Sequence, residues 1–312
     1  MGKLSKLVAG TAGLATVGTI SAEVVLYLLS NRNGNVDFLW NGEESEHNKL
    51  IRLRREEDYY WLISQELEHY YITSRDGLKL HASLLKSKEP SDRYIFAVHG
   101  YRCNGNKEFD SIARFYHENN INVFMIDHRA SGESEGKYIT YGAKESEDCM
   151  DWLAFMISEF GSNIKIALHG CSMGSATVML LTGNVLPANV KCAVADCGYS
   201  SLKDQLYHNF RQNKMLPQIF YPLYRKAAML QADFDPDTVT PLQSVERCQI
   251  PIIFAHGKSD DFVPYKMVLA LNDACSSPDK KLFCVEGAEH VQSFQLSNEF
   301  KTAIIENINK YM

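Results

Sequence analysis

The chain has 312 residues, of which 45% are hydrophobic and 22% are charged, and its formal net charge is -6. This length and composition are typical of a soluble globular protein with one large domain or two small ones. Because the acidic balance leaves no basic footprint for phosphate contacts, we do not expect nucleic acid as a partner.

The first feature along the chain is an apolar N-terminal stretch, residues 7–29 (LVAGTAGLATVGTISAEVVLYLL). A helix of this length can span a bilayer, although the carboxylate of Glu23 would be costly in hydrocarbon. We therefore expect residues 1–34 to be a hydrophobic segment that associates the protein with a membrane. The alternative is a helix packed on the domain of a cytoplasmic protein. Eight scattered cysteines without a CxxC pair favour that alternative, because they indicate buried free thiols in a reducing compartment.

A charged stretch over residues 35–65 predicts a helical connector, after which we expect one domain over residues 66–312. This domain starts with HYYITSRDGLKLHASLL, where two strand patterns flank the turn residues Asp76 and Gly77. The sequence therefore predicts that the domain opens with an antiparallel hairpin.

Strand and helix patterns then alternate to the end of the chain. The expected strands are YIFAVHG, NVFMIDH, NIKIALHG, VKCAVADCG, IPIIFAHG and KKLFCVEG, and the expected helices cover residues 107–119, 143–160, 173–181, 266–274 and 291–312. The pattern predicts an α/β fold with a mostly parallel eight-stranded sheet flanked by helices. Residues 199–247 break the alternation, so we expect a helical cap inserted there, after the sixth strand, above the edge where parallel strands end.

Two adjacent candidate nucleophiles, Cys171 and Ser172, lie in the sequence ALHGCSMGSAT. The G-x-S-x-G pattern follows a predicted strand and opens a predicted helix, which is the context of a nucleophile elbow. The central residue of such a turn is exposed to substrate at strained backbone angles. This position selects Ser172, and it predicts that the Cys171 side chain is directed back toward the sheet.

A serine nucleophile needs a base to accept its proton and an acid to orient that base. His290 follows the last predicted strand and is the candidate base. Asp260 follows the preceding strand and is the candidate acid. Asp261 is the near alternative for the acid, and Asp196, at the end of VKCAVAD, is a third.

The oxyanion of a tetrahedral intermediate needs hydrogen-bond donors. The amide of Met173, the first residue of the helix after Ser172, is one expected donor. The turn after YIFAVHG supplies the other, from Tyr101 or alternatively Arg102. We interpret DHRASGES, residues 127–134, as a structural brace for the adjoining loop. No phosphate-loop, zinc or dinucleotide motif is present, so we expect no metal and no cofactor.

With Ser172, Asp260 and His290 in this order at successive strand ends, the chain resembles the α/β-hydrolase superfamily over roughly residues 66–312. The motifs HGY, DHRASGES, GCSMGS, HGKSDDFVP and GAEH carry the resemblance. Within the superfamily the chain looks most like bacterial esterase-like or prolyl-oligopeptidase-like hydrolases with an N-terminal hydrophobic segment. The resemblance implies a serine hydrolase that works through an acyl-enzyme. One departure is Ala130, where many members have glycine.

The function expected from these features is cleavage of a small carboxylic ester. We expect apolar cap residues to line the acyl pocket, namely Phe210, Leu216, Ile219, Phe220, Tyr221, Leu223 and Tyr224. A peptidase or amidase acting on a short peptide would use the same machinery and is the alternative. A third hypothesis is a catalytically silent, membrane-tethered binding protein that keeps only the fold.

Overall fold

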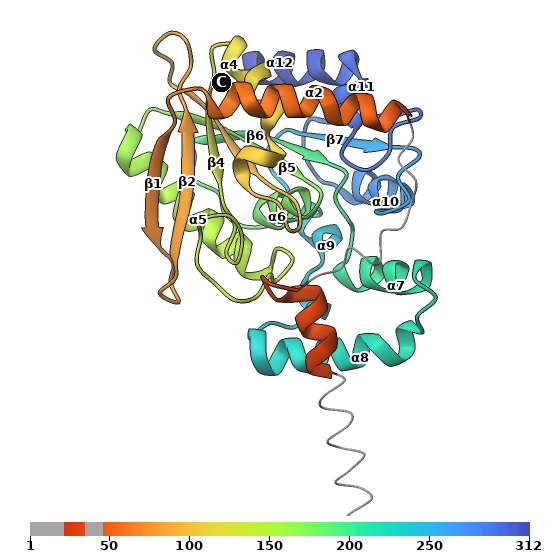
Figure 1. The fold of residues 1–312 in the computed structure, drawn as a ribbon. Helices are drawn as coiled ribbons and strands as arrows, with labels where there is room; N and C mark the ends of the chain where they lie inside the picture. The colour runs from red at the N-terminus through yellow and green to blue at the C-terminus, as the bar shows by residue number, and fades with distance from the viewer. Residues whose placement is uncertain (1–21, 35–45) are drawn as a thin grey trace, which may run out of the picture.

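The strands in the described part of the chain form one eight-stranded sheet, in the order β1-β2-β4-β3-β5-β6-β7-β8 (Figure 1). The computed structural model describes residues 22–34 and 46–312. The strands are β1 (Glu68–Thr73), β2 (Lys79–Leu85), β3 (Arg93–Val98), β4 (Asn122–Ile126), β5 (Lys165–Cys171), β6 (Val190–Asp196), β7 (Ile252–Gly257) and β8 (Lys280–Val285). β2 is antiparallel to both β1 and β4, and every other pairing is parallel. The predicted α/β fold is confirmed.

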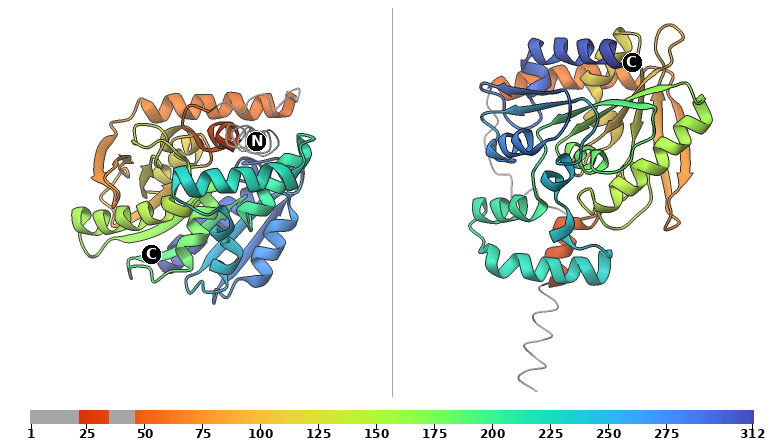
Figure 2. Two further views of the ribbon diagram at one scale, coloured as in Figure 1. Left: turned by 90° about the horizontal axis from the view of Figure 1, so that it is seen from below. Right: turned by 180° about the vertical axis from the view of Figure 1, so that it is seen from behind.

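Helices cover both faces of the sheet (Figures 1 and 2). One face carries α2 (Glu46–Ile63), α4 (Asp110–Glu118), α11 (Ser293–Leu296) and α12 (Asn298–Tyr311), and the other carries α5 (Ala143–Phe160), α6 (Met173–Thr182), α9 (Pro241–Val245) and α10 (Lys266–Ala274). Successive strand residues point to opposite faces. In β3, for example, Phe96 joins one buried cluster while Ile95 and Ala97 join the other. The central strands therefore bury apolar side chains on both faces.

The helix ends agree with the sequence prediction at some positions and differ at others. α5 and α10 have the predicted bounds. The predicted helix over 107–119 is instead two helices, α3 (Gly105–Glu108) and α4, which meet at Phe109. The predicted terminal helix over 291–312 is also two helices. Ser297 separates them in an extended conformation, and its hydroxyl caps α12 by accepting a hydrogen bond from the amide of Phe300.

The segment between β6 and β7 is largely helical. It contains α7 (Leu202–Gln212), α8 (Pro217–Ala227), a π-helical turn (Ala228–Ala232), a 3-10 turn (Pro236–Thr238) and α9. α8 is amphipathic, because Tyr221 and Tyr224 are buried in the core while Ile219 is 53% exposed. A short helix over residues 22–30 packs beside α8, where Ser30 Oγ and Tyr224 Oη lie 2.9 Å apart (Figure 1).

The helix over residues 22–30 is the described part of the predicted membrane segment. Ala22, Val25 and Leu26 are buried in the same core as α8. This side of the helix therefore packs on the domain, while Val24 and Tyr27 on the other side are about half exposed. Residues 7–21 of the predicted segment lie outside the described residues. Within residues 22–34 and 46–312, no helix has both the length and the apolar composition needed to cross a membrane.

Candidate active site

The turn between β5 and α6 places Ser172 in a strained backbone conformation. Its φ is 55° and its ψ is -117°, outside the regions that side chains ordinarily favour. The glycines on either side permit this turn. A Cβ at Gly170 would lie 2.3 Å from the carbonyl oxygen of Gly174, and a Cβ at Gly174 would lie 1.8 Å from that of Val98. Larger residues do not fit at either position, so the G-x-S-x-G pattern is a steric requirement of this turn.

The neighbouring thiol, Cys171, is fully buried. It packs among the apolar residues of the face that carries α2, α4 and α12. Burial also raises its pKa well above the ordinary range, so the thiolate is strongly disfavoured. Cys171 is therefore a packing residue, as predicted, and it cannot reach a substrate. All eight cysteines are free thiols, and six of them are buried.

Ser172, His290 and Asp260 form a continuous hydrogen-bonded chain. His290 Nε2 lies 2.8 Å from Ser172 Oγ, and His290 Nδ1 lies 2.7 Å from Asp260 Oδ2. Each residue comes from the carboxyl end of a different strand, β5, β7 or β8, which brings positions far apart in the sequence to one edge of the sheet. The ring of Phe262 packs edge-on against His290 at 4.7 Å between centroids. The structure thus brings together the three residues singled out from the sequence.

Asp260 is held as an anion. Its Oδ1 accepts hydrogen bonds from the amides of Phe262 and Val263, at 2.9 and 2.8 Å. Burial opposes ionisation, but His290 and His256 outweigh it and lower the pKa of Asp260. His256 is a further partner of this carboxylate that no sequence motif marks as such. Its Nε2 lies 3.2 Å from Asp260 Oδ2, and its place four residues before Asp260 on the same strand end is the signal that could have identified it.

The two alternative acids occupy different places. The side chain of Asp261 is exposed at the rim of the site. Asp196 is buried at the end of β6, and its backbone carbonyl accepts the amide of Ser172 at 2.9 Å. Neither carboxylate oxygen of Asp196 has a hydrogen bond of good geometry to the described residues, and burial raises its pKa to about 7 although Ser293, His256 and His290 oppose the rise. Only Asp260 contacts His290.

The turn after β3 lies directly against Ser172. A Cβ at Gly100 would lie 3.2 Å from Ser172 Cβ. His99 holds this turn: its Nε2 accepts the amide of His128 at 3.0 Å, so its Nδ1 carries the hydrogen and donates to the carbonyl of Gly100 at 2.6 Å. Burial lowers the pKa of His99, which keeps the ring neutral. Tyr101 and Met173 line the cavity beside Ser172.

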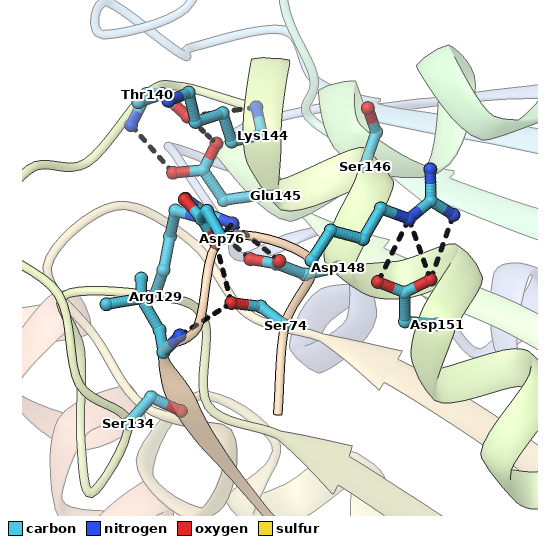
Figure 3. A network of polar contacts seen from close by, with 12 residues as sticks. Ser74, Asp76, Arg129, Ser134, Thr140, Lys144, Glu145, Ser146, Asp148 and Asp151 are labelled. Atoms are coloured by element: carbon cyan, nitrogen blue, oxygen red, sulfur yellow. Dashed lines mark hydrogen bonds and ion pairs between the residues drawn. The ribbon is translucent and has the colours of Figure 1, made fainter. Parts of the chain in front are cut away.

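The segment DHRASGES braces this edge of the sheet. Asp127 Oδ1 accepts the amide of Gly105, just after the turn, and its Oδ2 accepts the amide of Glu133, both at 2.9 Å. Figure 3 shows Arg129 clamped between Asp148 and Asp76. Ala130 has a φ of 59°, a conformation that favours glycine, which accounts physically for the glycine common there in the resembled family.

Several strained backbone conformations lie around Ser172. Among the described non-glycine residues with positive φ, four belong to this edge: Arg102 in the turn after β3, Ser172, Cys197 after β6 and Val291 after His290. Val291 is β-branched, so its φ of 59° is especially unfavourable. Such strain persists only where the surrounding structure imposes it, and it is typical of functional sites.

A cavity of about 1640 Å³ opens above Ser172 and His290. Its walls differ from the predicted ones. Of the predicted cap residues only Phe210 is among the described lining residues, because Tyr221 and Tyr224 pack into the core and Leu216 and Ile219 face outward. Part of the apolar lining comes from α7, the residues after it and the helix over 22–30, namely Leu206, Phe210, Met215, Val25, Leu28 and Leu29. α2 adds Ile51, Tyr59 and Tyr60, beside the charged residues Arg52, Arg55 and Glu56.

This arrangement has the parts required for nucleophilic attack on an acyl group. The imidazole of His290 is placed to take the proton of Ser172, and Asp260 fixes the ring so that Nε2 faces the hydroxyl. The cavity can hold an apolar substrate against Ser172.

Comparisons with known proteins agree with this geometry. Residues 107–301 match the prolyl oligopeptidase family. The protein YqkD of Bacillus subtilis is 30% identical over 176 residues, which cover 55% of this chain and 57% of YqkD. The protein Bem46 of Schizosaccharomyces pombe is 24% identical over 73% of this chain and 72% of its own.

Among solved structures, the esterase Pf2001 of Pyrococcus furiosus superposes with a TM-score of 0.66, at 23% identity, over 80% of this chain and 93% of its own. This likeness shows a shared fold, and the resemblance inferred from the sequence motifs is confirmed. The family match covers more than half of the chain and includes Ser172, Asp260 and His290. The chain therefore belongs to the prolyl oligopeptidase family and is a serine hydrolase of the α/β-hydrolase type.

Proposed function

We propose that the protein hydrolyses carboxylic esters with an apolar acyl or alcohol group, through an acyl-enzyme on Ser172. The observation that carries the proposal is the chain of hydrogen bonds from Ser172 through His290 to Asp260. Ser172 is the nucleophile, His290 the general base and Asp260 the acid that orients the base. No metal or cofactor takes part in the proposed steps.

The first half-reaction acylates the enzyme. Ser172 Oγ attacks the carbonyl carbon of the ester while His290 Nε2 takes the hydroxyl proton. The carbonyl oxygen becomes an oxyanion and accepts hydrogen bonds from the amides of Met173 and Tyr101. The bond to the alcohol oxygen then breaks, and His290 returns its proton to that oxygen as the alcohol leaves.

The second half-reaction restores the serine. A water molecule attacks the acyl carbon and gives a proton to His290 Nε2. The carboxylic acid leaves when the bond to Ser172 Oγ breaks, and His290 then protonates that oxygen. Asp260 remains ionised throughout, which stabilises the imidazolium formed in both half-reactions.

The cavity supports an ester with apolar groups as substrate. Its described wall includes aliphatic and aromatic side chains from two separate segments, with Leu28 and Leu29 on one and Leu206 and Phe210 on the other. The name of the structural neighbour Pf2001, an esterase, points the same way. The name of the matched family favours a second candidate, peptide bond cleavage by the same residues.

Labelling with a fluorophosphonate probe tests the nucleophile. Wild-type protein should become labelled, Ser172→Ala should not, and Cys171→Ala should label like the wild type because its thiol is buried. We expect Ser172→Ala to lower kcat by roughly 10³-fold or more. Labelling of Ser172→Ala would refute the assignment of this serine.

A substrate panel separates the two candidates. Nitrophenyl esters of increasing acyl length should be cleaved with a kcat/KM that rises with chain length up to the size of the cavity. Aminoacyl anilides should be cleaved at least about a hundredfold less efficiently, a difference of about 3 kcal/mol in transition-state binding. A preference for the anilides would replace the ester proposal by the peptidase one.

A further inference from the structure

A cluster of metal-ligand side chains lies on the β1–β2 hairpin and is separate from the active-site residues. His69 Nδ1 and His81 Nε2 are 2.9 Å apart. Together with a carboxylate oxygen of Glu133, these atoms all lie within 4.8 Å of one another. The exposed loop carboxylate and the exposed His69 face the buried His81, so the cluster is open to solvent on one side.

The strand register explains why the two histidines meet. Tyr71 on β1 pairs with His81 on β2, and His69 pairs with Ser83. His69 is therefore a diagonal neighbour of His81 on the same face of the hairpin, within reach of a long side chain. Their rings are stacked, with centroids 5.2 Å apart and planes inclined by 23°.

A carboxylate behind His81 fixes which of its nitrogens faces the cluster. His81 Nδ1 lies 2.8 Å from Asp127 Oδ2, and this carboxylate is buried. Asp127 also accepts the amides of Gly105 and Glu133, both at 2.9 Å. The carboxylate is thus an acceptor on each side, so His81 Nδ1 donates to it and Nε2 presents a lone pair to His69.

Metal-binding histidines characteristically donate their second ring nitrogen to a carboxylate in this manner. Glu133 has an outer partner as well, because Tyr71 Oη donates to its Oε2 at 3.1 Å. Lys79 lies over the ring of Tyr71, at 4.0 Å from the centroid, and is the cation on this face that partly offsets the two carboxylates.

We propose that His69, His81 and Glu133 bind a divalent transition-metal ion of the Zn²⁺ class, with Asp127 as the outer partner of His81. With an ion about 2.0–2.1 Å from both nitrogens, their present separation gives a nitrogen–metal–nitrogen angle of roughly 90°. Increasing the distance between the two nitrogens to roughly 3.3 Å gives the tetrahedral angle. Glu133 is on an exposed loop and swings inward to bind. Water takes the remaining position.

Each imidazole would bind the ion through the lone pair of one ring nitrogen. In the metal-free pair, His69 Nδ1–H donates to the lone pair of His81 Nε2. When the ion binds, the His69 proton moves to Nε2 through solvent, and both lone pairs turn to the metal. The ion would then join β1, β2 and the loop after β4, the three segments that carry its ligands.

The test is a titration of the full chain with Zn²⁺ in competition with a chromophoric chelator. Wild-type protein should bind one equivalent, and His69→Gln and Glu133→Gln should each weaken that binding by at least about tenfold. His117→Gln and Glu118→Gln, partly exposed or exposed residues away from the cluster, are the matched controls and should bind like the wild type. Zn²⁺ should raise the melting temperature of the wild type and not that of the double variant His69→Gln/Glu133→Gln.

Cys197, Asp260 and His290 form a second group of atoms that could bind the ion, so the titration also includes a variant of this group. If zinc binds there instead, His290→Gln loses the tight equivalent and the hairpin variants keep it, which overturns the proposal. Equal affinity in wild type and in the double hairpin variant also overturns it. Because His69 and Glu133 are exposed, melting temperatures without zinc should be unchanged, so loss of binding is not loss of fold.

Discussion

The nucleophile turn and the helical segments above it are held in place by different forces. At the turn, backbone sterics decide the geometry: Gly170 and Gly174 admit no side chain, and Ser172 is fixed at a positive φ. Above it, side-chain hydrogen bonds join distant segments, such as Ser30 with Tyr224 and Tyr199 with the carbonyl of Tyr141. The backbone geometry at Ser172 is therefore built into local sequence, while the walls of the cavity depend on tertiary contacts.

The largest loss of activity should come from a change at Asp260, the proposed acid. Asp260→Asn removes the acceptor that orients His290 and should lower kcat by about 10⁴-fold. Asp261→Asn changes an exposed neighbour and should leave kcat within about twofold. Steady-state kinetics on one nitrophenyl ester decide this. Equal losses in the two variants would show that position along the loop, and not the contact with His290, matters.

A smaller effect should come from Asp196, the buried carboxyl beside the site. Its pKa is raised to about 7 in the folded protein, so the folded state keeps this proton to higher pH than the unfolded chain. The resulting stability is complete below the unfolded pKa of about 3.9 and is lost as the pH rises through 7. Between about pH 5 and about pH 8, this group should lower the free energy of unfolding by roughly 3 kcal/mol.

Urea unfolding of wild type and Asp196→Asn across this pH range measures the Asp196 contribution. The variant should lose the slope that Asp196 causes, so the difference between the two proteins should grow in favour of the variant at higher pH. Other groups titrate equally in both proteins and cancel. Parallel stability curves would mean that Asp196 does not titrate in this range.

The smallest effect should come from the helical segments above the site, residues 22–34 and α8. Arg102 donates to the carbonyls of Leu28, Asn31 and Gly34 and so ties residues 22–34 to the turn after β3. Arg102→Ala should cost about 1–3 kcal/mol of stability, raise KM more than it lowers kcat, and speed proteolysis within residues 22–34. Tyr224→Phe, which loses one hydrogen bond to Ser30, should cost about 1 kcal/mol.

Arg75→Ala is the control for Arg102, because it removes an exposed arginine paired with Asp151 and should cost at most about 1 kcal/mol. If Arg102→Ala lowers kcat as strongly as it raises KM, residues 22–34 support the geometry at Ser172 as well as the wall of the cavity, which contradicts the comparison.

The sequence was sufficient where local rules decide the structure. The bounds of α5 follow from its apolar spacing, and the chain of contacts among Ser172, Asp260 and His290 follows from the rule that parallel strands end at one edge. The two split helices were missed because a single residue interrupts each one. In α12 the reason is the cap: the hydroxyl of Ser297 satisfies the amide of Phe300 better than a continued helix would.

The sequence was insufficient where distant segments choose each other. Apolar residues of α8 were expected in the cavity, yet Tyr221 and Tyr224 face the core because the helix over 22–30 and the domain cover that side. The contact of His69 with His81 depends on which residues of two strands stand opposite, and the turn residues alone do not reveal the diagonal pair. His256 was missed for a similar reason, since its partner is set by the fold of the following loop.

The hydrogen bonds between Arg102 and residues 22–34 link the docking of this segment to the binding of ligand in the cavity. Val25, Leu28 and Leu29 form part of the cavity wall, so a bound substrate contacts both the N-terminal segment and the catalytic domain. Such a ligand favours the docked arrangement over the undocked one, and by thermodynamic reciprocity docking strengthens ligand binding by the same factor. Protection of residues 22–34 from proteolysis by a bound ligand would measure this coupling at a peptide bond remote from Ser172.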